Sequence, residues 1–422
     1  MLRTQFWLLL YKCLTWLALS ALVAALPLLS WFRPKFSKWV RMRFWPKPLG
    51  FQPELWVHAV SMGEIKIARA LLEVNGRPPA GSILLTTSTQ SGYRMLSETF
   101  GKDSVRYLPW DTGFSYRRLF GPFTVPNLIV VETEIWPCLF DFVHDGAGAL
   151  VIVNGRLSSR TMRMKKNPLF RRALGRVTKI FARSDLDADR FREFGVDPDR
   201  VRVTGNMKFD FKPALLEHGR LYDWLDRPGK LVIFASVSSD EIDLLAPGLA
   251  ALLHSLPDLR VLWVPRHLRD LEQHRQGLAA FEPGLRSRLD EEETASSSRF
   301  LILDSFGELS ALYGFADLSL VGGSFNQRGG QNFLESLQAG TPAVMGPSTE
   351  NFHREVAEAQ AEGVIICLKS PQEVAQTVLD LLGDTVKLKE MSRRARGFLA
   401  KHSGAIGRTS RELIKLKFFR ET

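Results

Sequence analysis

The stretch ADLSLVGGSFNQRGGQNFLESLQAGTPAVMGP, from Ala316 to Pro347, decides the fold of this chain. Its apolar run Leu318–Val321 predicts a buried strand, followed by a loop, a short helix and a second strand. Four glycines lie in the loop, where the lack of a Cβ lets the backbone approach a ligand closely; they are Gly322, Gly323, Gly329 and Gly330. This order of elements predicts one repeat of a parallel α/β sheet with a ligand at the loop.

The helix after the loop is expected to begin at Asn332 and to end before Gly340, because asparagine caps helix starts and glycine follows helix ends. A helix start presents unpaired N–H groups and a partial positive charge, which suits a phosphate. Glu335 would then accept hydrogen bonds from sugar hydroxyls. The spacing of Asn332 and Glu335 fits a capping box equally well, so on spacing alone a purely structural role stays open.

Length and charge bound the class of protein. A chain of 422 residues suggests about two domains. Three scattered cysteines, Cys13, Cys138 and Cys367, form neither a disulfide framework nor a metal cluster and indicate a reducing compartment. The net charge of +11 indicates an anionic partner, which leaves nucleic acid, an anionic membrane and phosphorylated substrates open.

The N-terminus carries an uncharged apolar run from Cys13 to Phe32, which is long enough to cross a bilayer as a helix. Trp16 and Trp31 lie near its ends, as interfacial aromatic residues do. Far more positive charges follow the run than precede it, so we expect a membrane anchor with the bulk of the protein in the cytoplasm. A cleaved signal peptide is opposed by the positive flank, and a helix lying in the membrane interface is a further alternative.

Strand-like runs then alternate with helical patterns in two series, which predicts two doubly wound α/β domains. The first series comprises Leu55–Val60, Ser82–Thr87, Leu128–Val131, Ala149–Val153 and Ile180–Ala182, and the second comprises Leu231–Ser236, Val261–Val264, Phe300–Leu303, Leu318–Val321 and Ala343–Met345. The expected parts are an anchor with its basic flank (1–48), a first domain (49–210), a linker (211–229), a second domain (230–405) and a C-terminal helix packing back on the first domain (406–422).

Chemically capable residues follow several predicted strands. Glu64 could take a proton from an attacking hydroxyl, although Ser61 and Glu64 also have capping-box spacing. Glu132 directly follows an apolar strand, where a carboxylate is unusual unless it is paired or functional. Lys208 follows a glycine turn and by itself is an ordinary surface lysine. Arg266 could grip a phosphate with its guanidinium.

A basic stretch without acids runs from Arg156 to Lys179. Such a stretch is also typical of a nucleic-acid groove or of a solvated helical face. Beside a membrane segment, however, anionic lipid headgroups are the better-supported partner, and we expect no nucleic acid. Asp185 and Asp187 match a short acidic pattern of metal-dependent sugar transferases. They lie in an expected first helical turn, where acids are common, and we assign them no metal.

Taken in order, the motifs resemble the 3-deoxy-D-manno-octulosonic acid (Kdo) transferases, and the likeness covers nearly the whole chain. They are HAVSMGE, TTSTQSG, ETEIWP, NGRLSSR, VTGNMKFD, VPRH, FGEL and VGGSFNQRGGQNFLE. The resemblance implies an α/β fold of the GT-B type, with two Rossmann-like domains facing a cleft and an apolar N-terminal membrane-anchor helix. It implies transfer of Kdo from CMP-Kdo to the lipid A precursor at the cytoplasmic face of the bacterial inner membrane, without a metal or other cofactor.

The resemblance also implies roles for single residues. Glu64 would be the general base of an inverting reaction, and Glu132 and Lys208 would assist the transition state. The CMP-binding residues would be Pro265, Arg266, Phe306, Gly307, Glu308, Asn332, Phe333, Leu334 and Glu335. This chain departs from the family pattern where HNPLE is replaced by Gln331-Asn-Phe-Leu-Glu335 and STHEGEE by Ser236-Val-Ser-Ser-Asp-Glu241. These departures concern the donor side.

Overall fold

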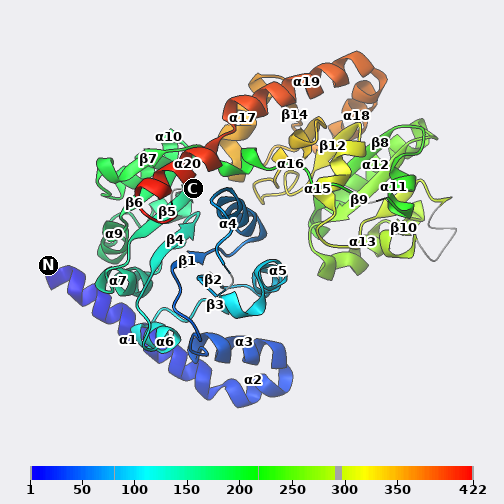
Figure 1. The fold of residues 1–422 in the computed structure, drawn as a ribbon. Coiled ribbons are helices and arrows are strands. Elements are labelled where there is room, and N and C mark those ends of the chain that lie inside the picture. Colours follow the sequence, from blue (N-terminus) through cyan, green and yellow to red (C-terminus); the bar gives the residue numbers. More distant parts are fainter. Residues whose placement is uncertain (1, 80, 217, 290–296, 421–422) are drawn as a thin grey trace. The chain divides into compact units, whose positions relative to one another are not determined.

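The computed structural model describes residues 2–79, 81–216, 218–289 and 297–420. The chain divides into two compact units. Unit 1 comprises Met1–Asp210 with Ser403–Thr422, and unit 2 comprises Phe211–His402. Each unit is built on a parallel sheet of seven strands. Figure 1 shows the helices that accompany each sheet. The expected α/β fold with two Rossmann-like units is confirmed.

The sheet of unit 1 has the order β3-β2-β1-β4-β5-β6-β7. Its strands are short and rich in Leu, Ile and Val, as expected for parallel strands that are covered on both faces. They are β1 (Leu55–His58), β2 (Ile83–Thr87), β3 (Val105–Tyr107), β4 (Asn127–Val131), β5 (Leu150–Gly155), β6 (Lys179–Ala182) and β7 (Val201–Val203).

The helices of unit 1 cover this sheet and extend it at the N-terminus. One face of the sheet shares a buried core with α6, α7, α9 and α10. The bounds are α1 (Leu2–Ala24), α2 (Leu26–Phe32), α3 (Pro34–Phe44), α4 (Met62–Val74), α5 (Gln90–Phe100), α6 (Gly113–Phe120), α7 (Pro137–Asp145), α8 (Ser159–Met162), α9 (Pro168–Gly175), α10 (Asp185–Glu193) and α20 (Ala405–Lys415).

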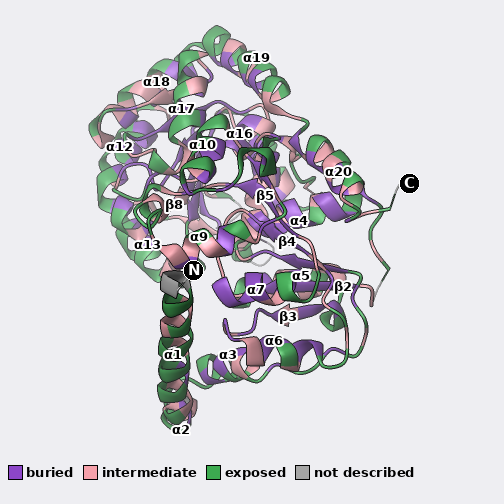
Figure 2. Cartoon of the chain, turned by 90° about the vertical axis from the view of Figure 1, so that its left-hand side faces the viewer, coloured by how far each residue is buried: buried purple, intermediate pink, exposed green. Residues whose placement is uncertain are grey.

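The sheet of unit 2 has the order β10-β11-β9-β8-β12-β13-β14. Its strands are β8 (Leu231–Val237), β9 (Arg260–Pro265), β10 (Gly284–Leu285), β11 (Phe300–Ile302), β12 (Leu318–Val321), β13 (Ala343–Met345) and β14 (Ile365–Cys367). Its helices are α11 (Arg220–Leu225), α12 (Ile242–Ser255), α13 (Leu271–Gly277), α15 (Leu309–Leu312), α16 (Leu334–Gln338), α17 (His353–Ala361), α18 (Val374–Gly383) and α19 (Thr385–His402). Figure 2 shows that the strands are buried and that the helices expose one side.

The stretch between the two sheets and the C-terminal stretch both contain helices that pack on a unit. Within 211–229, α11 places Leu221, Trp224 and Leu225 in a buried cluster of unit 2. At the other end, α20 packs on α4 in unit 1, where Leu413 is fully buried. Asp210 holds the start of α20, because its carboxylate accepts hydrogen bonds from the backbone N–H of Gly404 and of Ile406.

The expected N-terminal apolar helix is also present. Among the described residues, one helix, within Gln5–Ala24, is long and apolar enough to cross a membrane by length and composition. The helix belongs to α1, and most of its surface is exposed.

Candidate active site

The order of strands fixes where a ligand would bind in each unit. In unit 1 the strand order reverses between β1 and β4, because β2 and β3 extend from β1 to one side while β5 to β7 extend from β4 to the other. Ligands of doubly wound sheets bind outside the carboxyl ends of the strands at such a reversal. Helix α4, whose first turn carries Glu64, follows β1, and Glu132 directly follows β4. Two of the predicted catalytic residues therefore flank this point.

Glu64 lies in the first turn of α4 and is largely buried. Its Oε2 accepts a hydrogen bond from the backbone N–H of Val60 (2.7 Å), and its Oε1 accepts one from the Ser61 hydroxyl (2.9 Å). The Ser61 hydroxyl in turn accepts from the Glu64 N–H, so the capping interaction exists as well. Burial raises the pKa of Glu64, and the nearby charge of Glu132 raises it further. Glu64 is thus a helix-capping residue whose carboxylate is also more basic than usual.

Glu132 forms a close ion pair with Lys208, with 2.6 Å between Oε1 and Nζ. Burial alone would raise the pKa of Glu132, but Lys208, Arg183 and Arg156 outweigh it and bring the pKa below its ordinary value. Gly63, the residue before Glu64, approaches the same lysine: a Cβ at this glycine would lie 3.5 Å from Lys208 Cε. The three predicted catalytic residues are therefore brought together from three separate strand ends.

A third carboxylate, Glu134, lies beside this group. Its Oε2 accepts a hydrogen bond from Trp136 Nε1 (2.9 Å) and lies 3.7 Å from His58 Nε2. His58 is fully buried at the end of β1, and its Nδ1 contacts the Thr86 carbonyl oxygen at 3.0 Å. Although burial opposes it, the interaction with His58 lowers the pKa of Glu134. The pKa values of the neighbouring carboxyls are thus pushed apart, which is how acid and base roles are separated in active sites.

Three residues at strand ends, two in unit 1 and one in unit 2, have a strained backbone. Glu132 (φ +59°), Asn154 (φ +52°) and Ser236 (φ +55°) all adopt the left-handed conformation, which residues other than glycine rarely do. Such conformations persist where the surrounding structure enforces them, most often at functional sites. Asn154 is fully buried, and its Oδ1 accepts from the Met207 N–H (2.9 Å) next to Lys208. It thereby helps to position the lysine.

In unit 2 the strand order reverses between β8 and β12. A fully buried carboxylate, Glu241, joins the loops that follow these two strands. Its Oε2 accepts from the N–H of Ser238 (2.9 Å) and of Gly323 (2.7 Å), and its Oε1 accepts from the N–H of Phe325 (3.0 Å). Glu241 therefore fixes the start of the glycine-rich loop to the end of β8.

The glycine-rich loop differs from the expectation that its N–H groups and the following helix start hold a phosphate. Besides the two N–H groups bound to Glu241, those of Gly330 and Gln331 donate to the carbonyl groups of Gly323 and Gly322. The helix α16 is only five residues long and begins at Leu334, not at Asn332. Asn332 Oδ1 still accepts from the Leu334 N–H (3.3 Å), which satisfies another of these donors. The end of the helix was predicted correctly, since Gly340 follows it with φ +81°.

The cationic groups of unit 2 gather between the end of β9 and this loop. Burial and the nearby positive charge of Arg328 lower the pKa of Arg266. The pKa of His267 is also lowered, mainly by burial and further by the positive charges of Arg266 and Arg269. Arg328 belongs to the glycine-rich loop and pairs with Asp240 (3.1 Å). Like charges that are held this close favour binding of an anion between them.

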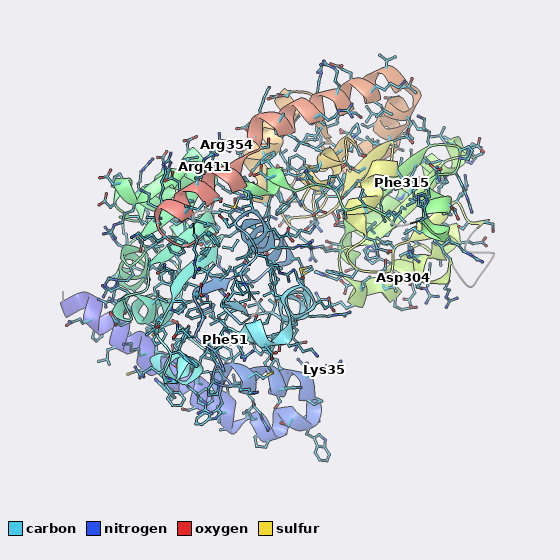
Figure 3. All side chains as sticks on the ribbon, viewed as in Figure 1. Lys35, Phe51, Asp304, Phe315, Arg354 and Arg411 are labelled. Atoms are coloured by element: carbon cyan, nitrogen blue, oxygen red, sulfur yellow. The ribbon has the colours of Figure 1, made fainter. Side chains whose placement is uncertain are left out.

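The remaining residues predicted for nucleotide binding have different environments. Phe306 is exposed (67%), and Gly307 after it adopts φ +94°. Glu308 accepts a hydrogen bond from Arg286 (3.1 Å), and Asp304, which Figure 3 labels, accepts one from the Ser287 N–H (2.8 Å).

In the stretch Asn332–Glu335, the side chains of Phe333 and Leu334 are fully buried, and Phe333 packs edge to face on Phe352. Only the backbone of these two residues can face a ligand. Glu335 is half-buried and lies close enough to Tyr313 for its charge to contribute to the raised pKa of that phenol, which is due mainly to burial. Pro265 ends β9 and is fully buried in the strand.

Three residues of the site were missed by the sequence analysis: Asn154, Glu241 and Arg328. Ser238 and Glu241 have capping-box spacing, and the box is formed. The capping-box spacing indicates only a local role for Glu241. It gives no sign of the two hydrogen bonds that Glu241 accepts from a loop more than 80 positions away. Arg328 had a recognisable signal, because it is the arginine inside the glycine-rich loop.

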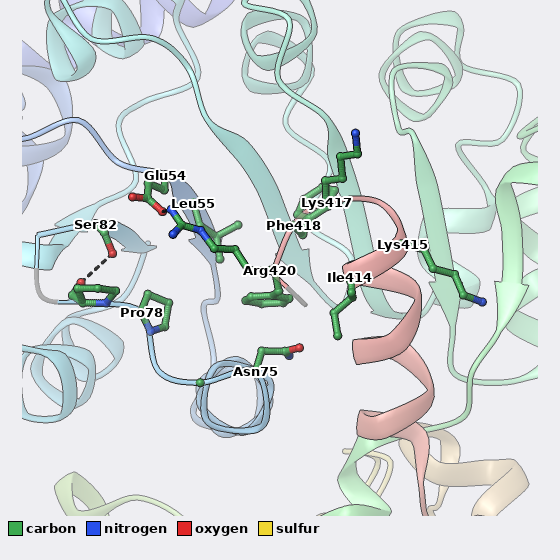
Figure 4. A pocket seen from close by; sticks show the side chains of 13 residues that line it. Glu54, Leu55, Asn75, Pro78, Ser82, Ile414, Lys415, Lys417, Phe418 and Arg420 are labelled. Atoms are coloured by element: carbon green, nitrogen blue, oxygen red, sulfur yellow. Dashed lines mark hydrogen bonds and ion pairs between the residues drawn. The ribbon is translucent and has the colours of Figure 1, made fainter. Parts of the chain in front are cut away.

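A cavity of about 840 Å³ lies at the other end of the first sheet. Figure 4 shows the side chains that line it. Glu54 and Ser82, which line it, precede β1 and β2, so the cavity opens at the amino ends of the strands. None of the predicted site residues lines it. The acidic pair Asp185 and Asp187 also stays outside the site: Asp187 is buried and binds Arg183, Ser184 and the Leu157 N–H.

Comparison with known proteins identifies relatives of this chain. Residues 38–211 match the family model of 3-deoxy-D-manno-octulosonic-acid transferase (kdotransferase). The 3-deoxy-D-manno-octulosonic acid transferase of Bordetella pertussis is 30% identical over 86% of this chain and 87% of its own length. The one of Haemophilus influenzae is 30% identical over 86% of both. A UDP-N-acetylglucosamine 2-epimerase, 12% identical over 88% of this chain and 98% of its own, shares the fold with a TM-score of 0.58.

Proposed function

The chain belongs to the 3-deoxy-D-manno-octulosonic acid (Kdo) transferase family, and we propose that it transfers Kdo from CMP-Kdo to the lipid A precursor, lipid IVA. The family membership establishes a glycosyltransferase of Kdo. The donor nucleotide, the lipid acceptor and the mechanism are the parts proposed here.

The observation that carries the mechanism is the contrast between Glu64 and Glu132. Glu64 has a raised pKa and is free of any described ion pair, which suits a group that must accept a proton near neutral pH. Glu132 stays ionised beside Lys208, so it holds the lysine in place and keeps Glu64 basic. We assign Glu64 as the general base, with Glu132 and Lys208 as residues that stabilise the transition state.

The proposed reaction is a single displacement. Glu64 takes the proton of an acceptor hydroxyl as that oxygen forms a bond to the anomeric carbon of Kdo. The bond between this carbon and the phosphate oxygen of CMP breaks, and CMP leaves with the electron pair. Attack opposite to the leaving group inverts the anomeric carbon.

The cationic group in unit 2 supports the assignment of a nucleoside monophosphate as leaving group. Arg266 and Arg328, with Arg269, can neutralise the charge that develops on the phosphate, whereas the lowered pKa of His267 leaves its imidazole mostly uncharged at neutral pH. We propose that this cationic group takes the place of a divalent metal. Pro265, Phe306–Glu308 and Asn332–Glu335 would surround the rest of CMP, with Phe333 and Leu334 contributing only their backbone.

We further propose that the protein acts at the cytoplasmic face of the inner membrane, where a lipid acceptor is available. The apolar α1 and the net charge of +11 support attachment to an anionic membrane and not to nucleic acid.

Incubation of the purified protein with CMP-Kdo and lipid IVA tests the proposal. We expect a product heavier by one or more Kdo residues, with release of CMP and without a requirement for divalent metal in the presence of EDTA. Inhibition by CMP should exceed inhibition by UDP. Turnover of a UDP-sugar with no use of CMP-Kdo would refute the proposed donor.

A further inference from the structure

Helix α1 is apolar over most of its surface, yet it is covered mainly along one stripe. The partly or fully buried positions Leu8, Tyr11, Thr15, Leu19 and Leu22 recur every three or four residues and form one line along the helix, while Leu10 is partly buried on another side. On its other sides α1 exposes large apolar side chains, namely Phe6, Leu9, Leu14 and Leu17. Figure 2 shows this exposed surface along α1.

The covered stripe is attached to the body of unit 1 at several points. Tyr11 donates a hydrogen bond to Asp111 Oδ2 (2.8 Å), a buried carboxylate that also accepts from Tyr116 and from the N–H groups of Cys138 and Leu139. Further along α1, Trp16 packs on the ring of Phe114 with 5.9 Å between centroids.

The helix α1 also packs on α9. Figure 1 shows α1 running along one side of unit 1, past α7 and α6, to the pair of helices α2 and α3. The attachment therefore extends over most of the helix and is not confined to one end.

This attachment is incompatible with a helix that crosses the bilayer. From Leu8 to Leu22 the covered stripe is about 21 Å long, whereas the hydrocarbon core is about 30 Å thick. A spanning α1 would draw the elements attached to it into the hydrocarbon. Among them, α9 carries Arg172, which pairs with Asp141 at 3.0 Å, and Arg176 directly after α9 makes a second such pair. Half-buried ion pairs of this kind require water or polar headgroups.

The charge around the exposed apolar surface indicates its partner. The first acidic residue of the chain is Glu54, so α1, α2 and α3 contain no carboxylate side chain. Trp31 and Phe32 at the end of α2 are exposed by 84% and 71%. Next to them, α3 exposes Lys35, Lys38 and Arg41, and Figure 3 labels Lys35. Exposed aromatic side chains beside cations are the signature of helices that lie at an anionic membrane surface.

We propose that α1, α2 and α3 form an in-plane membrane attachment, in which α1 lies parallel to an anionic phospholipid bilayer and inserts only its exposed apolar side. The basic segment that leads into α9, the helix that packs on α1, exposes Arg160, Arg163 and Lys166, which would face the headgroups. This inference deepens the proposed location of the enzyme by replacing a spanning anchor with an interfacial one. It predicts that the whole chain stays on one side of the membrane.

Depth measurements distinguish the two arrangements. Single cysteines at Leu9, Leu17 and Leu28, in a full-length chain without Cys13, Cys138 and Cys367, would carry spin labels in vesicles of phosphatidylethanolamine and phosphatidylglycerol. We expect all three labels at a similar shallow depth of about 5–10 Å. A crossing helix instead places residues 9 and 17 about 12 Å apart in depth, and this result would overturn the proposal. Labels that lack lipid contact and couple to one another would overturn it too, because a second copy of the chain would then cover the apolar side.

Sedimentation with vesicles tests whether the exposed apolar residues of α1 and α2 bind the membrane. Leu17→Glu and Trp31→Glu should each weaken binding to the anionic vesicles by about tenfold or more. Val386→Glu makes the same kind of change at an exposed apolar residue of unit 2 and should leave vesicle binding unchanged. Equal binding of all variants would contradict the proposal.

Amide hydrogen exchange in β1 to β7 serves as the folding control for the Leu17 and Trp31 variants, because both residues belong to unit 1. The two proposals can fail separately in these experiments. A protein that binds vesicles in the plane but neither binds CMP nor transfers Kdo refutes the proposed function alone.

Discussion

Glu64 combines two features in one side chain, since it caps α4 and its pKa is raised while those of Glu132 and Glu134 are lowered. The Glu64→Gln variant keeps the size and one acceptor of the side chain but cannot take a proton. We expect kcat for Kdo transfer to fall by about a thousandfold, which is within the usual contribution of a general base. CMP affinity, measured by calorimetry, should not change. Glu73→Gln at the exposed end of the same helix is the matched control, and near-normal transfer by Glu64→Gln would refute the assignment.

The raised pKa of Glu64 has a consequence for the pH dependence of transfer. A general base works only when ionised, so kcat/KM should fall as the pH drops through the pKa of Glu64, above the range of an ordinary glutamate. Glu132→Gln removes the neighbouring negative charge and leaves Lys208 uncompensated, which lowers the pKa of Glu64. The acidic limb of the profile should therefore move to lower pH. Glu98→Gln, exposed on α5, should leave the limb in place, and a limb that moves upward in Glu132→Gln contradicts the electrostatic account.

The pair of Glu132 and Lys208 is mostly buried, so loss of one partner leaves an uncompensated charge. Lys208→Met should lower the free energy of unfolding by about 3 kcal/mol at neutral pH. In Glu132→Gln with Lys208→Met both charges are gone, and we expect part of this loss to be recovered. Chemical denaturation of the two single variants and the double variant gives the coupling energy. Strictly additive effects would show that the pair contributes nothing of its own.

At the scale of elements, the glycine-rich loop after β12 is positioned by Glu241 and not by its own helix. Glu241→Gln replaces a carboxylate with three N–H partners by an amide with only one acceptor oxygen. We expect a loss of about 2 kcal/mol in the stability of unit 2. CMP affinity should fall by about tenfold, because the loop would no longer be held next to Arg266.

Asp243→Asn, two residues further on and exposed on α12, provides the control for calorimetry and denaturation. Unchanged CMP affinity in Glu241→Gln would show that the bonds to the loop are structural only.

At the scale of the molecule, unit 1 is completed by the last helix of the chain. Thr409 and Ser410 of α20 bind Thr204 and Asn75 (2.8 and 2.6 Å), and Leu413 is buried against the unit. Leu413→Ala should therefore destabilise unit 1 by about 3 kcal/mol. Amide hydrogen exchange should speed up in β1 to β7 and stay unchanged in β8 to β14. Leu244→Ala, at an exposed leucine, is the control, and equal acceleration in both units would mean that they unfold as one.

The sequence by itself determined the two α/β units, most strand positions and the residues at strand ends, because buried parallel strands are short apolar runs and glycine marks their turns. It also determined the family, because eight ordered motifs are far more specific than any one of them. Only the tertiary structure decided which polar groups already have hydrogen-bond partners within the protein. Glu241 accepts hydrogen bonds from two N–H groups of the glycine-rich loop, which are therefore not available to a phosphate. Helix α16 is too short for its dipole to contribute to phosphate binding. The tertiary structure is also what supports the proposed interfacial use of the apolar N-terminus, since length and composition describe a spanning helix and an interfacial helix alike. The covered stripe of α1 and the bond from Tyr11 to Asp111 separate the two, because a contact between residues 100 positions apart leaves no trace in local sequence.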